Sequence, residues 1–156
     1  MNTISLGDTL PDINLNGTGD QVINLSTLAG NKIVLYFYPK DSTPGCTQEG
    51  LDFNSHYLKF KRSNCIILGV SRDNIASHQK FKEKQEFKFD LLSDPEEVLC
   101  SVFDVIKMKN MYGKKVRGIE RSTFLFNSDG TLTQEWRKIK VQGHVDEVLT
   151  AVKALK

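Results

Sequence analysis

Cys46 occupies a position where a cysteine can act as a nucleophile. It follows Thr43 and Pro44, an order typical of a helix start, with threonine as N-cap and proline as first helical residue. Cys46 then falls in the first turn, where unpaired N–H groups and the positive end of the helix dipole stabilise a thiolate. The flanking turn is polar, so we expect solvent access. Placement alone favours a reactive thiol and a packing residue about equally.

The segments around Cys46 predict a strand followed by a helix. Ile33–Tyr38 is a continuous apolar run, as in strands that are buried on both faces, and Pro39 ends it. We predict a helix from Pro44 to Lys61, with Cys46 on its inward face. This prediction rests on the helical spacing of five residues: Cys46, Gly50, Phe53, Tyr57 and Phe60.

The remaining patterns complete an α/β domain. We predict an N-terminal hairpin (Ile13–Leu15 and Val22–Leu25), strands at Cys65–Val70, Phe89–Leu92, Ser122–Phe126 and Leu132–Ile139, and helices at Asn74–Gln85, Pro95–Phe103 and Val145–Leu155. Lys107–Gly118 is polar and basic, and we interpret it as a loop. The order predicts a mixed central sheet flanked by helices, in a single domain over residues 1–156.

Composition excludes several classes of protein. With 156 residues, 39% hydrophobic and 26% charged, the chain is neither disordered nor a disulfide scaffold. A net charge of +2 argues against a nucleic-acid partner. No apolar run has the roughly 18 residues that a membrane span needs, and no basic-then-apolar leader opens the chain. We therefore expect a cytoplasmic protein.

Two separated motifs resemble those of one enzyme family. The segment from Phe37 to Glu49 resembles the active-site segment of the peroxiredoxins, whose P-x-x-x-T-x-x-C pattern is filled by Pro39, Thr43 and Cys46. The longer string YPKD followed by TPGCT is similar to the bacterioferritin comigratory protein (PrxQ) subfamily.

The second motif lies further along the chain. Gly118–Leu125 resembles the strand that bears the family's active-site arginine, here Arg121. The order of segments matches from Leu6 to Leu155, so the resemblance covers nearly the whole chain.

The resemblance implies a thioredoxin-like fold with an N-terminal hairpin and the activity of a thiol-dependent peroxidase. The implied substrates are hydrogen peroxide and small organic hydroperoxides, and the implied role is antioxidant defence. Cys46 would attack the peroxide, Arg121 and Thr43 would hold it, and Pro39 would shield the thiolate. Glu49 matches a position that helps orient the arginine. No haem, flavin or metal is implied, and the subfamily suggests a monomer.

The chain departs from the family where the sulfenic acid must be resolved. Many members carry a resolving cysteine five residues after the first, where this chain has Leu51. Others carry it on the next helix, about Ala76–Lys82, which has no cysteine here. Cys65 begins an apolar strand, so we expect it to be a buried core residue. Cys100 lies beyond the edge of its helix's apolar arc, so we expect it to be partly exposed and keep it as a candidate resolving residue.

We therefore predict a one-cysteine mechanism, in which thioredoxin, glutaredoxin or a small thiol reduces Cys46. Two alternatives stay open: a thiol–disulfide oxidoreductase, and a redox sensor or holdase that uses Cys46 as a switch. The missing C-x-x-C counts against the first, and the matched Thr43 and Arg121 count against the second. The three histidines show no metal-ligand spacing: His56, His78 and His144.

Overall fold

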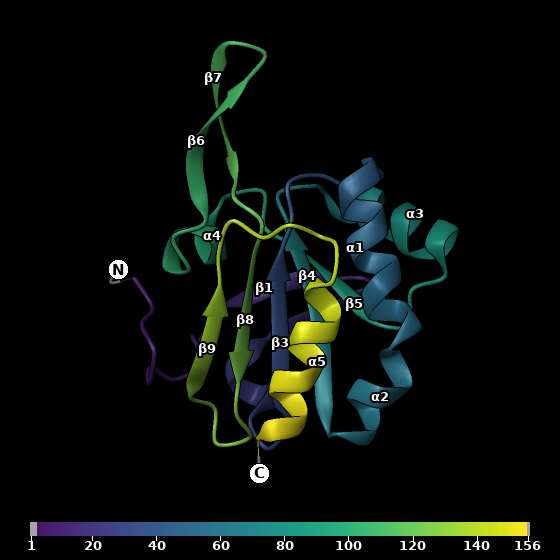
Figure 1. The fold of residues 1–156 in the computed structure, drawn as a ribbon, viewed down its shortest axis with the longest axis vertical. Helices are drawn as coiled ribbons and strands as arrows, with labels where there is room; N and C mark the ends of the chain where they lie inside the picture. The colour runs from purple at the N-terminus through teal and green to yellow at the C-terminus, as the bar shows by residue number, and fades with distance from the viewer. Residues whose placement is uncertain (1–2, 156) are drawn as a thin grey trace.

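A seven-stranded mixed sheet forms the centre of the computed structural model, which describes residues 3–155 (Figure 1). The strand order is β2-β1-β5-β4-β3-β8-β9. Three neighbouring strands are parallel: β3 (Lys32–Phe37), β4 (Cys65–Ser71) and β5 (Asp90–Ser93). β8 (Ser122–Phe126) pairs antiparallel with β3, and β9 (Leu132–Trp136) with β8. The predicted N-terminal hairpin, β1 (Asn14–Gly17) and β2 (Gln21–Asn24), extends the sheet through β5.

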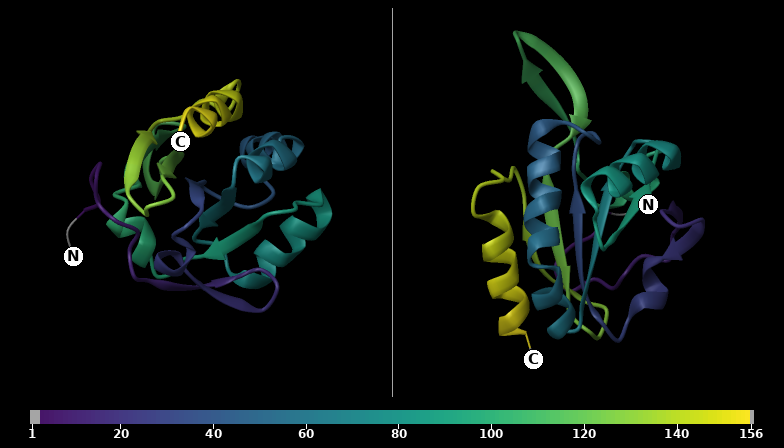
Figure 2. Two further views of the ribbon diagram at one scale, coloured as in Figure 1. Left: turned by 90° about the horizontal axis from the view of Figure 1, so that it is seen from below. Right: turned by 90° about the vertical axis from the view of Figure 1, so that its right-hand side faces the viewer.

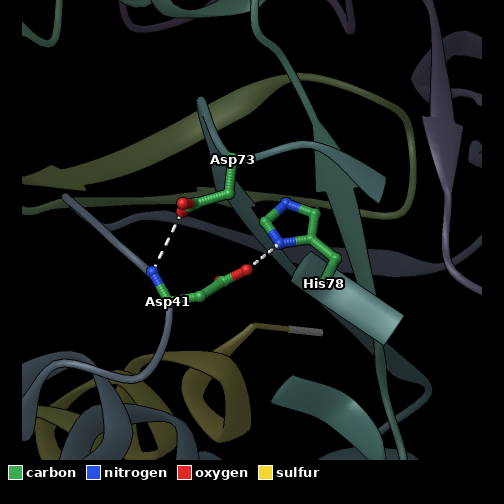
Figure 3. Close-up of side chains that lie close together, drawn as sticks. All are labelled: Asp41, Asp73 and His78. Atoms are coloured by element: carbon green, nitrogen blue, oxygen red, sulfur yellow. Dashed lines mark hydrogen bonds and ion pairs between the residues drawn. The ribbon is translucent and has the colours of Figure 1, made fainter. Parts of the chain in front are cut away.

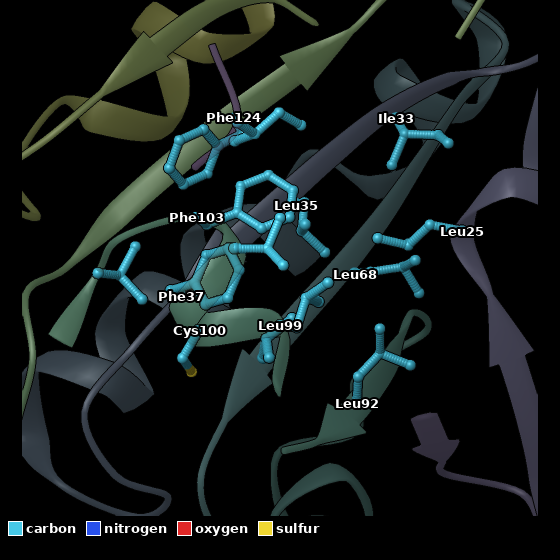
Figure 4. Packing of buried hydrophobic residues seen from close by; sticks show 14 of the residues in the cluster. Leu25, Ile33, Leu35, Phe37, Leu68, Leu92, Leu99, Cys100, Phe103 and Phe124 are labelled. Atoms are coloured by element: carbon cyan, nitrogen blue, oxygen red, sulfur yellow. The ribbon is translucent and has the colours of Figure 1, made fainter. Parts of the chain in front are cut away.

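Helices cover both faces of the sheet (Figure 2). Val34 and Tyr36 of β3 pack into a core with four helices, α1 (Pro44–Ser55), α2 (Tyr57–Arg62), α3 (Ile75–Gln85) and α5 (His144–Ala154). Leu35 and Phe37 point to the opposite face and pack with α4 (Val98–Val102) and the 3-10 helix η1 (Leu25–Leu28) (Figure 4). β3 is therefore buried on both faces, as its apolar run predicted.

The long helix predicted from Pro44 to Lys61 is wrong in one respect, because it breaks at His56 into α1 and α2. The His56 ring Nδ1 lies 3.1 Å from the Asp52 carbonyl. In a continuous helix that carbonyl would accept the His56 backbone N–H, which bonds instead to Phe53, at 3.2 Å. The imidazole competes for the acceptor and ends the helix.

The helix predicted from Pro95 to Phe103 begins three residues later, at Val98. Asp94 still organises the start, since its carboxylate accepts the backbone N–H groups of Val98, at 2.9 Å, and Cys100, at 2.8 Å. Glu97 adopts a left-handed conformation with φ 60°, so the residues before it form a turn rather than a helical first turn. The strand predicted from Leu132 to Ile139 also ends early, at Trp136.

The loop predicted for Lys107–Gly118 is also wrong, because this segment forms a two-stranded hairpin of β6 (Ile106–Met111) and β7 (Lys114–Ile119). Tyr112 and Gly113 make the turn with φ 53° and 80°. Two left-handed central residues match the twist of paired strands. The polar composition hid this signal, because most of the hairpin is exposed and needs no apolar face.

Gly50 lets α1 approach the aromatic core. A Cβ at this position would lie 2.4 Å from Cζ of Phe87, and that ring is packed between Phe81 and Phe89, with centroids 5.1 and 4.9 Å away. We expect Gly50→Ala to lower the free energy of unfolding by about 1–3 kcal/mol, although alanine favours helix by about 1 kcal/mol. Urea unfolding measures the effect. The control is Lys59→Ala, at an exposed position of α2, and is expected to stay within about 0.5 kcal/mol of wild type. Unchanged stability of Gly50→Ala would show that the Phe87 ring has room to move.

Over residues 3–155, the helices are too short or too polar to cross a membrane.

Candidate active site

Cys46 lies in the first turn of α1, as predicted, and its side chain is buried, with 2% of the residue exposed. Thr43 is the N-cap and Pro44 the first helical residue. The Cys46 N–H belongs to the first turn, where donors have no intrahelical acceptor. Because β3 ends at Phe37 and α1 begins at Pro44, a short loop delivers Cys46 to the carboxyl end of the parallel strands, where α/β proteins usually bind ligands.

Arg121 reaches Cys46 from the segment between β7 and β8. Its Nη2 lies 3.5 Å from the Cys46 Sγ, although the two residues are 75 positions apart in the chain. Gly45 makes room for this approach, since a Cβ there would lie 3.2 Å from Arg121 Nη2. A guanidinium at this distance stabilises a thiolate and keeps further N–H donors for a bound oxygen.

Glu49 holds the guanidinium in place. Its Oε1 accepts a hydrogen bond from Arg121 Nη1 at 2.7 Å, and the residue is fully buried. Burial raises the pKa of Glu49, and the positive charge of Arg121 lowers it. Burial is the larger effect, and the resulting pKa is about 7. Burial lowers the pKa of Arg121, but Glu49 and Cys46 outweigh this effect and raise it overall. The structure thus brings three predicted site residues into one contact chain, Glu49, Arg121 and Cys46.

Pro39 and Thr43 lie on the loop between β3 and α1, and both are partly buried. The Thr43 hydroxyl donates to the Lys40 carbonyl at 2.7 Å and does not cap the helix with its side chain. Because that hydrogen is committed to Lys40, the Thr43 oxygen can serve a ligand only as an acceptor in this conformation.

Sequence reasoning missed a buried polar network that fixes this loop (Figure 3). The Asp41 carboxylate accepts from the Tyr38 hydroxyl at 2.6 Å, the Ser77 hydroxyl at 2.8 Å and His78 Nδ1 at 2.7 Å. His78 Nε2 lies 2.8 Å from the Leu92 carbonyl. The His78 ring therefore bridges the Asp41 carboxyl group and the end of β5, with one ring nitrogen on each oxygen. The buried Asp41–His78 pair ties the active-site loop to α3.

Asp73 joins the same network through the backbone. Its Oδ2 accepts from the Asp41 N–H at 2.9 Å and from the Ser71 hydroxyl at 2.5 Å. Asp41, Asp73 and His78 are close enough to suggest a metal site. However, N–H and O–H hydrogens of the protein already point at these carboxylates, so the cluster fits a hydrogen-bond network and not a cation.

The other two cysteines lie away from this site. Cys65 is buried, as expected, and burial raises its pKa to about 12. Cys100 is fully buried, so the expected partial exposure is wrong. The reason is tertiary: the N-terminal segment covers α4, with the Ile4 N–H bonded to the Val102 carbonyl at 2.9 Å. Burial, and then the neighbouring Asp94, raise the pKa of Cys100.

A groove with a volume of about 660 Å³ runs beside the start of α1. Pro44, Gly45 and Gln48 line one side, and Val141 and Val145 the other. The groove therefore begins one residue from Cys46 and offers apolar side chains to a small organic group.

Comparisons with known proteins show which family the chain resembles. Residues 6–135 match the model of the AhpC/TSA family. The chain is 57% identical over 143 residues to Peroxiredoxin Bcp of Xanthomonas campestris pv. campestris, covering 92% of this chain and 89% of the relative. It is 48% identical to Peroxiredoxin Bcp of Bacillus subtilis, covering 97% and 96%.

Solved structures give the same result. The X. campestris Peroxiredoxin Q structure has a TM-score of 0.90 at 54% identity and covers 97% of this chain and 96% of its own. A trapped intermediate/ligand complex of X. campestris bacterioferritin comigratory protein, described with alkyl peroxide reduction activity, has a TM-score of 0.90 at 52% identity and covers 99% and 98%. The thioredoxin-like fold implied by the sequence is thereby confirmed.

Proposed function

Because the chain belongs to the AhpC/TSA family and, within it, to the PrxQ peroxiredoxins, it is a thiol-dependent peroxidase, and we propose that Cys46 is its peroxidatic residue and that an external thiol completes the cycle. The observation that carries the proposal is the 3.5 Å approach of Arg121 Nη2 to Cys46 Sγ at a helix N-terminus. The proposed substrates are hydrogen peroxide and small organic hydroperoxides, and the groove beside Pro44 supports the organic ones.

The first step transfers one oxygen to sulfur. The Cys46 thiolate attacks the terminal oxygen of the peroxide, the S–O bond forms and the O–O bond breaks. Sulfur is oxidised to the sulfenic acid, and the second oxygen leaves as hydroxide or alkoxide and takes up a proton as water or alcohol. Negative charge moves from sulfur to that oxygen, so the Arg121 donors stabilise both ends of the transfer.

Thr43 and Pro39 shape the entrance to this site. With its hydrogen bonded to the Lys40 carbonyl, the Thr43 hydroxyl oxygen can accept the peroxide O–H and so orient it for attack. Pro39, on the loop between β3 and α1, carries no N–H, and its proposed role is to shield the thiolate. Glu49 acts through Arg121 as a positioning residue.

The second half of the cycle uses an external reductant, because both other thiols are badly placed to form a disulfide with Cys46. Cys65 pairs with Lys32 at the start of β3, about 17 Å along the strand from its carboxyl end. Cys100 packs in the core on the other face of the sheet from Cys46. A disulfide needs Cα atoms within about 7 Å, so either bridge would require the fold to rearrange.

The external thiol therefore attacks the sulfenic sulfur directly. The S–O bond breaks, water leaves and a mixed disulfide forms. A second thiol then attacks the reductant's sulfur and restores the Cys46 thiolate, so that two thiols are oxidised for each peroxide reduced. Thioredoxin, glutaredoxin or a small thiol can supply them. We further propose that the enzyme works as a monomer in the cytoplasm, in antioxidant defence.

The double variant Cys65→Ala/Cys100→Ala tests this mechanism. We expect it to turn over peroxide with dithiothreitol within about twofold of wild type, because neither thiol takes part. Mass spectrometry after one equivalent of peroxide should find the sulfenic acid on Cys46 in both proteins. If the double variant is less stable than wild type, the single variants Cys65→Ala and Cys100→Ala show which substitution is responsible and test each thiol by itself.

A non-reducing peptide map provides the opposing outcome. A stoichiometric Cys46–Cys100 disulfide in peroxide-treated wild type, together with slow turnover of the double variant, would overturn the one-cysteine mechanism and leave the peroxidase activity itself intact.

A further inference from the structure

The β6–β7 hairpin projects from the body of the protein as an isolated arm (Figures 1 and 2). Among the strands of residues 3–155, its two strands pair only with each other. An arm of this kind buries little of its own surface, so its residue types reflect something other than the core of this domain.

Large apolar side chains are exposed on the arm. Four of them have exposed fractions between 43% and 100%: Met108, Met111, Tyr112 and Val116. Tyr112, at the turn, is the fully exposed one. The register places Met111 and Val116 on one face of the hairpin and Met108 on the other, with Tyr112 at the turn between them. Exposed tyrosine and methionine on a projecting segment indicate an interaction site, because these types are enriched in the centres of protein interfaces.

The arm is also purely cationic. From residue 106 to residue 119 it carries five basic residues and no acidic one. Lys107 and Arg117 are paired, with Asp104 at 3.0 Å and Glu97 at 2.5 Å. Within the described part of the chain, the other three have no carboxylate at ion-pair distance: Lys109, Lys114 and Lys115. The complementary surface is therefore acidic around an apolar centre.

The root of the arm is fixed. Arg117 makes two hydrogen bonds to the Glu97 carboxylate, at 2.5 and 2.6 Å, and Arg72 donates to the same group at 3.1 Å. Hydrogen bonds from Arg117 lower the pKa of Glu97 to about 2, so the clamp persists at physiological pH. The Glu120 N–H bonds to the Val105 carbonyl at 2.7 Å. A partner thus meets a preset arm, which lowers the ordering cost of binding.

The arm leads directly into the active site. β7 ends at Ile119, two residues before Arg121. Lys109, on the opposite strand, is partly buried, and burial together with the nearby charge of Arg121 lowers its pKa. A protein that binds along the hairpin therefore reaches, at the root of the arm, the Arg121–Cys46 contact where the reducing thiol must arrive.

We propose that the β6–β7 hairpin is the docking surface for a protein reductant whose reactive thiol is surrounded by an acidic surface with an apolar centre. The proposal rests on the peroxidase function and the external reductant proposed above. Exposed Lys114 and Lys115 beside Tyr112 fit a protein surface better than a nucleic acid, whose binding depends on many phosphate contacts. Small thiols need no docking surface and reduce Cys46 without it.

Charge reversal on the arm is the test. We compare Lys114→Glu/Lys115→Glu with Lys59→Glu/Lys61→Glu, which changes the net charge equally on α2, at the opposite end of the molecule (Figure 1). Turnover is measured with a bacterial thioredoxin and with dithiothreitol. With thioredoxin, we expect kcat/KM to fall about tenfold or more in the arm variant and less than about twofold in the control. The arm variant should keep its dithiothreitol rate, which also shows that it is folded.

Two further measurements sharpen the result. The thioredoxin kcat/KM of wild type should fall as salt rises from 20 to 300 mM, and that of the arm variant should not. Tyr112→Ser, which removes the apolar centre and keeps the charge, should raise KM for thioredoxin about threefold or more, without changing the dithiothreitol rate.

Several outcomes would overturn the docking proposal. Equal effects of the two double variants on thioredoxin kinetics would do so, as would a wild type that turns over with dithiothreitol but not with thioredoxin. Arm-dependent co-sedimentation with phosphatidylglycerol vesicles, combined with unchanged thioredoxin kinetics, would assign the arm to a lipid surface instead. Failure with dithiothreitol in wild type is different, because it would refute the peroxidase function itself.

Discussion

Cys46→Ser should lose peroxide reduction completely. Serine has the same shape, but its hydroxyl is not ionised at neutral pH and cannot accept an oxygen from a peroxide. We expect kcat/KM for hydrogen peroxide to fall at least about a thousandfold, the scale seen when a covalent nucleophile is removed. Stopped-flow peroxide consumption with dithiothreitol measures the loss, and a sulfenic acid probe should no longer label the protein.

Cys65→Ser is the matched control for this experiment. It also replaces a buried thiol, with 7% of the residue exposed, but at the start of β4, beside the first residue of β3. We expect it to keep the wild-type rate and the labelling of Cys46. If Cys46→Ser still consumed peroxide at a substantial rate, another group would have to carry the chemistry and the assignment of Cys46 would be wrong.

Arg121→Ala should have the second largest effect. It removes the donor 3.5 Å from Cys46 Sγ and leaves Glu49 as a buried carboxylate without its cation. We expect the rate of sulfenic acid formation to fall about 100- to 1000-fold, as when one donor of an oxyanion hole is lost. Single-turnover kinetics isolate this step from reduction by the thiol. Wild-type speed in Arg121→Ala would refute the proposed role.

Two further variants distinguish the effect of the positive charge of Arg121 from the effect of its planar geometry and its positioning by Glu49. Arg121→Lys keeps the positive charge but loses the planar fork that serves Glu49 and Cys46 together, so we expect a rate between those of wild type and Arg121→Ala. Glu49→Gln keeps the size of the side chain and removes its charge. Because Glu49 acts only through Arg121, its effect should be smaller than that of Arg121→Ala and should disappear when both residues are changed.

Short-range patterns were enough to predict much of the fold. The apolar run of β3, the Thr43–Pro44 helix start and the stripe of α5 each depend on neighbours within a few residues, so their elements appear in the structure as expected. The errors have local causes that hydrophobic periodicity does not register. The His56 ring competes for a backbone acceptor, Glu97 adopts a left-handed conformation, and the Tyr112–Gly113 turn closes a hairpin without an apolar face.

The active site likewise has one part that local sequence predicts and another that depends on the tertiary fold. The sequence by itself determined that Cys46 sits at a helix N-terminus behind Pro39 and Thr43, because all of these lie on one strand–loop–helix segment whose geometry is set by local dihedrals and caps. The resemblance singled out Arg121, but only the tertiary structure decided that its guanidinium reaches the sulfur across 75 residues of chain.

Tertiary packing also decided two features that helical periodicity could not predict: the burial of Cys100 and the pairing of Asp41 with His78. Cys100 is fully buried because the N-terminal segment covers α4, and the Asp41–His78 pair forms because the carboxyl end of β3 and the start of α3 meet above the sheet. Burial and pairing depend on which distant surfaces come together, and that follows from the strand order of the sheet. The reactivity of Cys46 is thus prepared locally, and its partners and its isolation from the other two thiols are products of the whole fold.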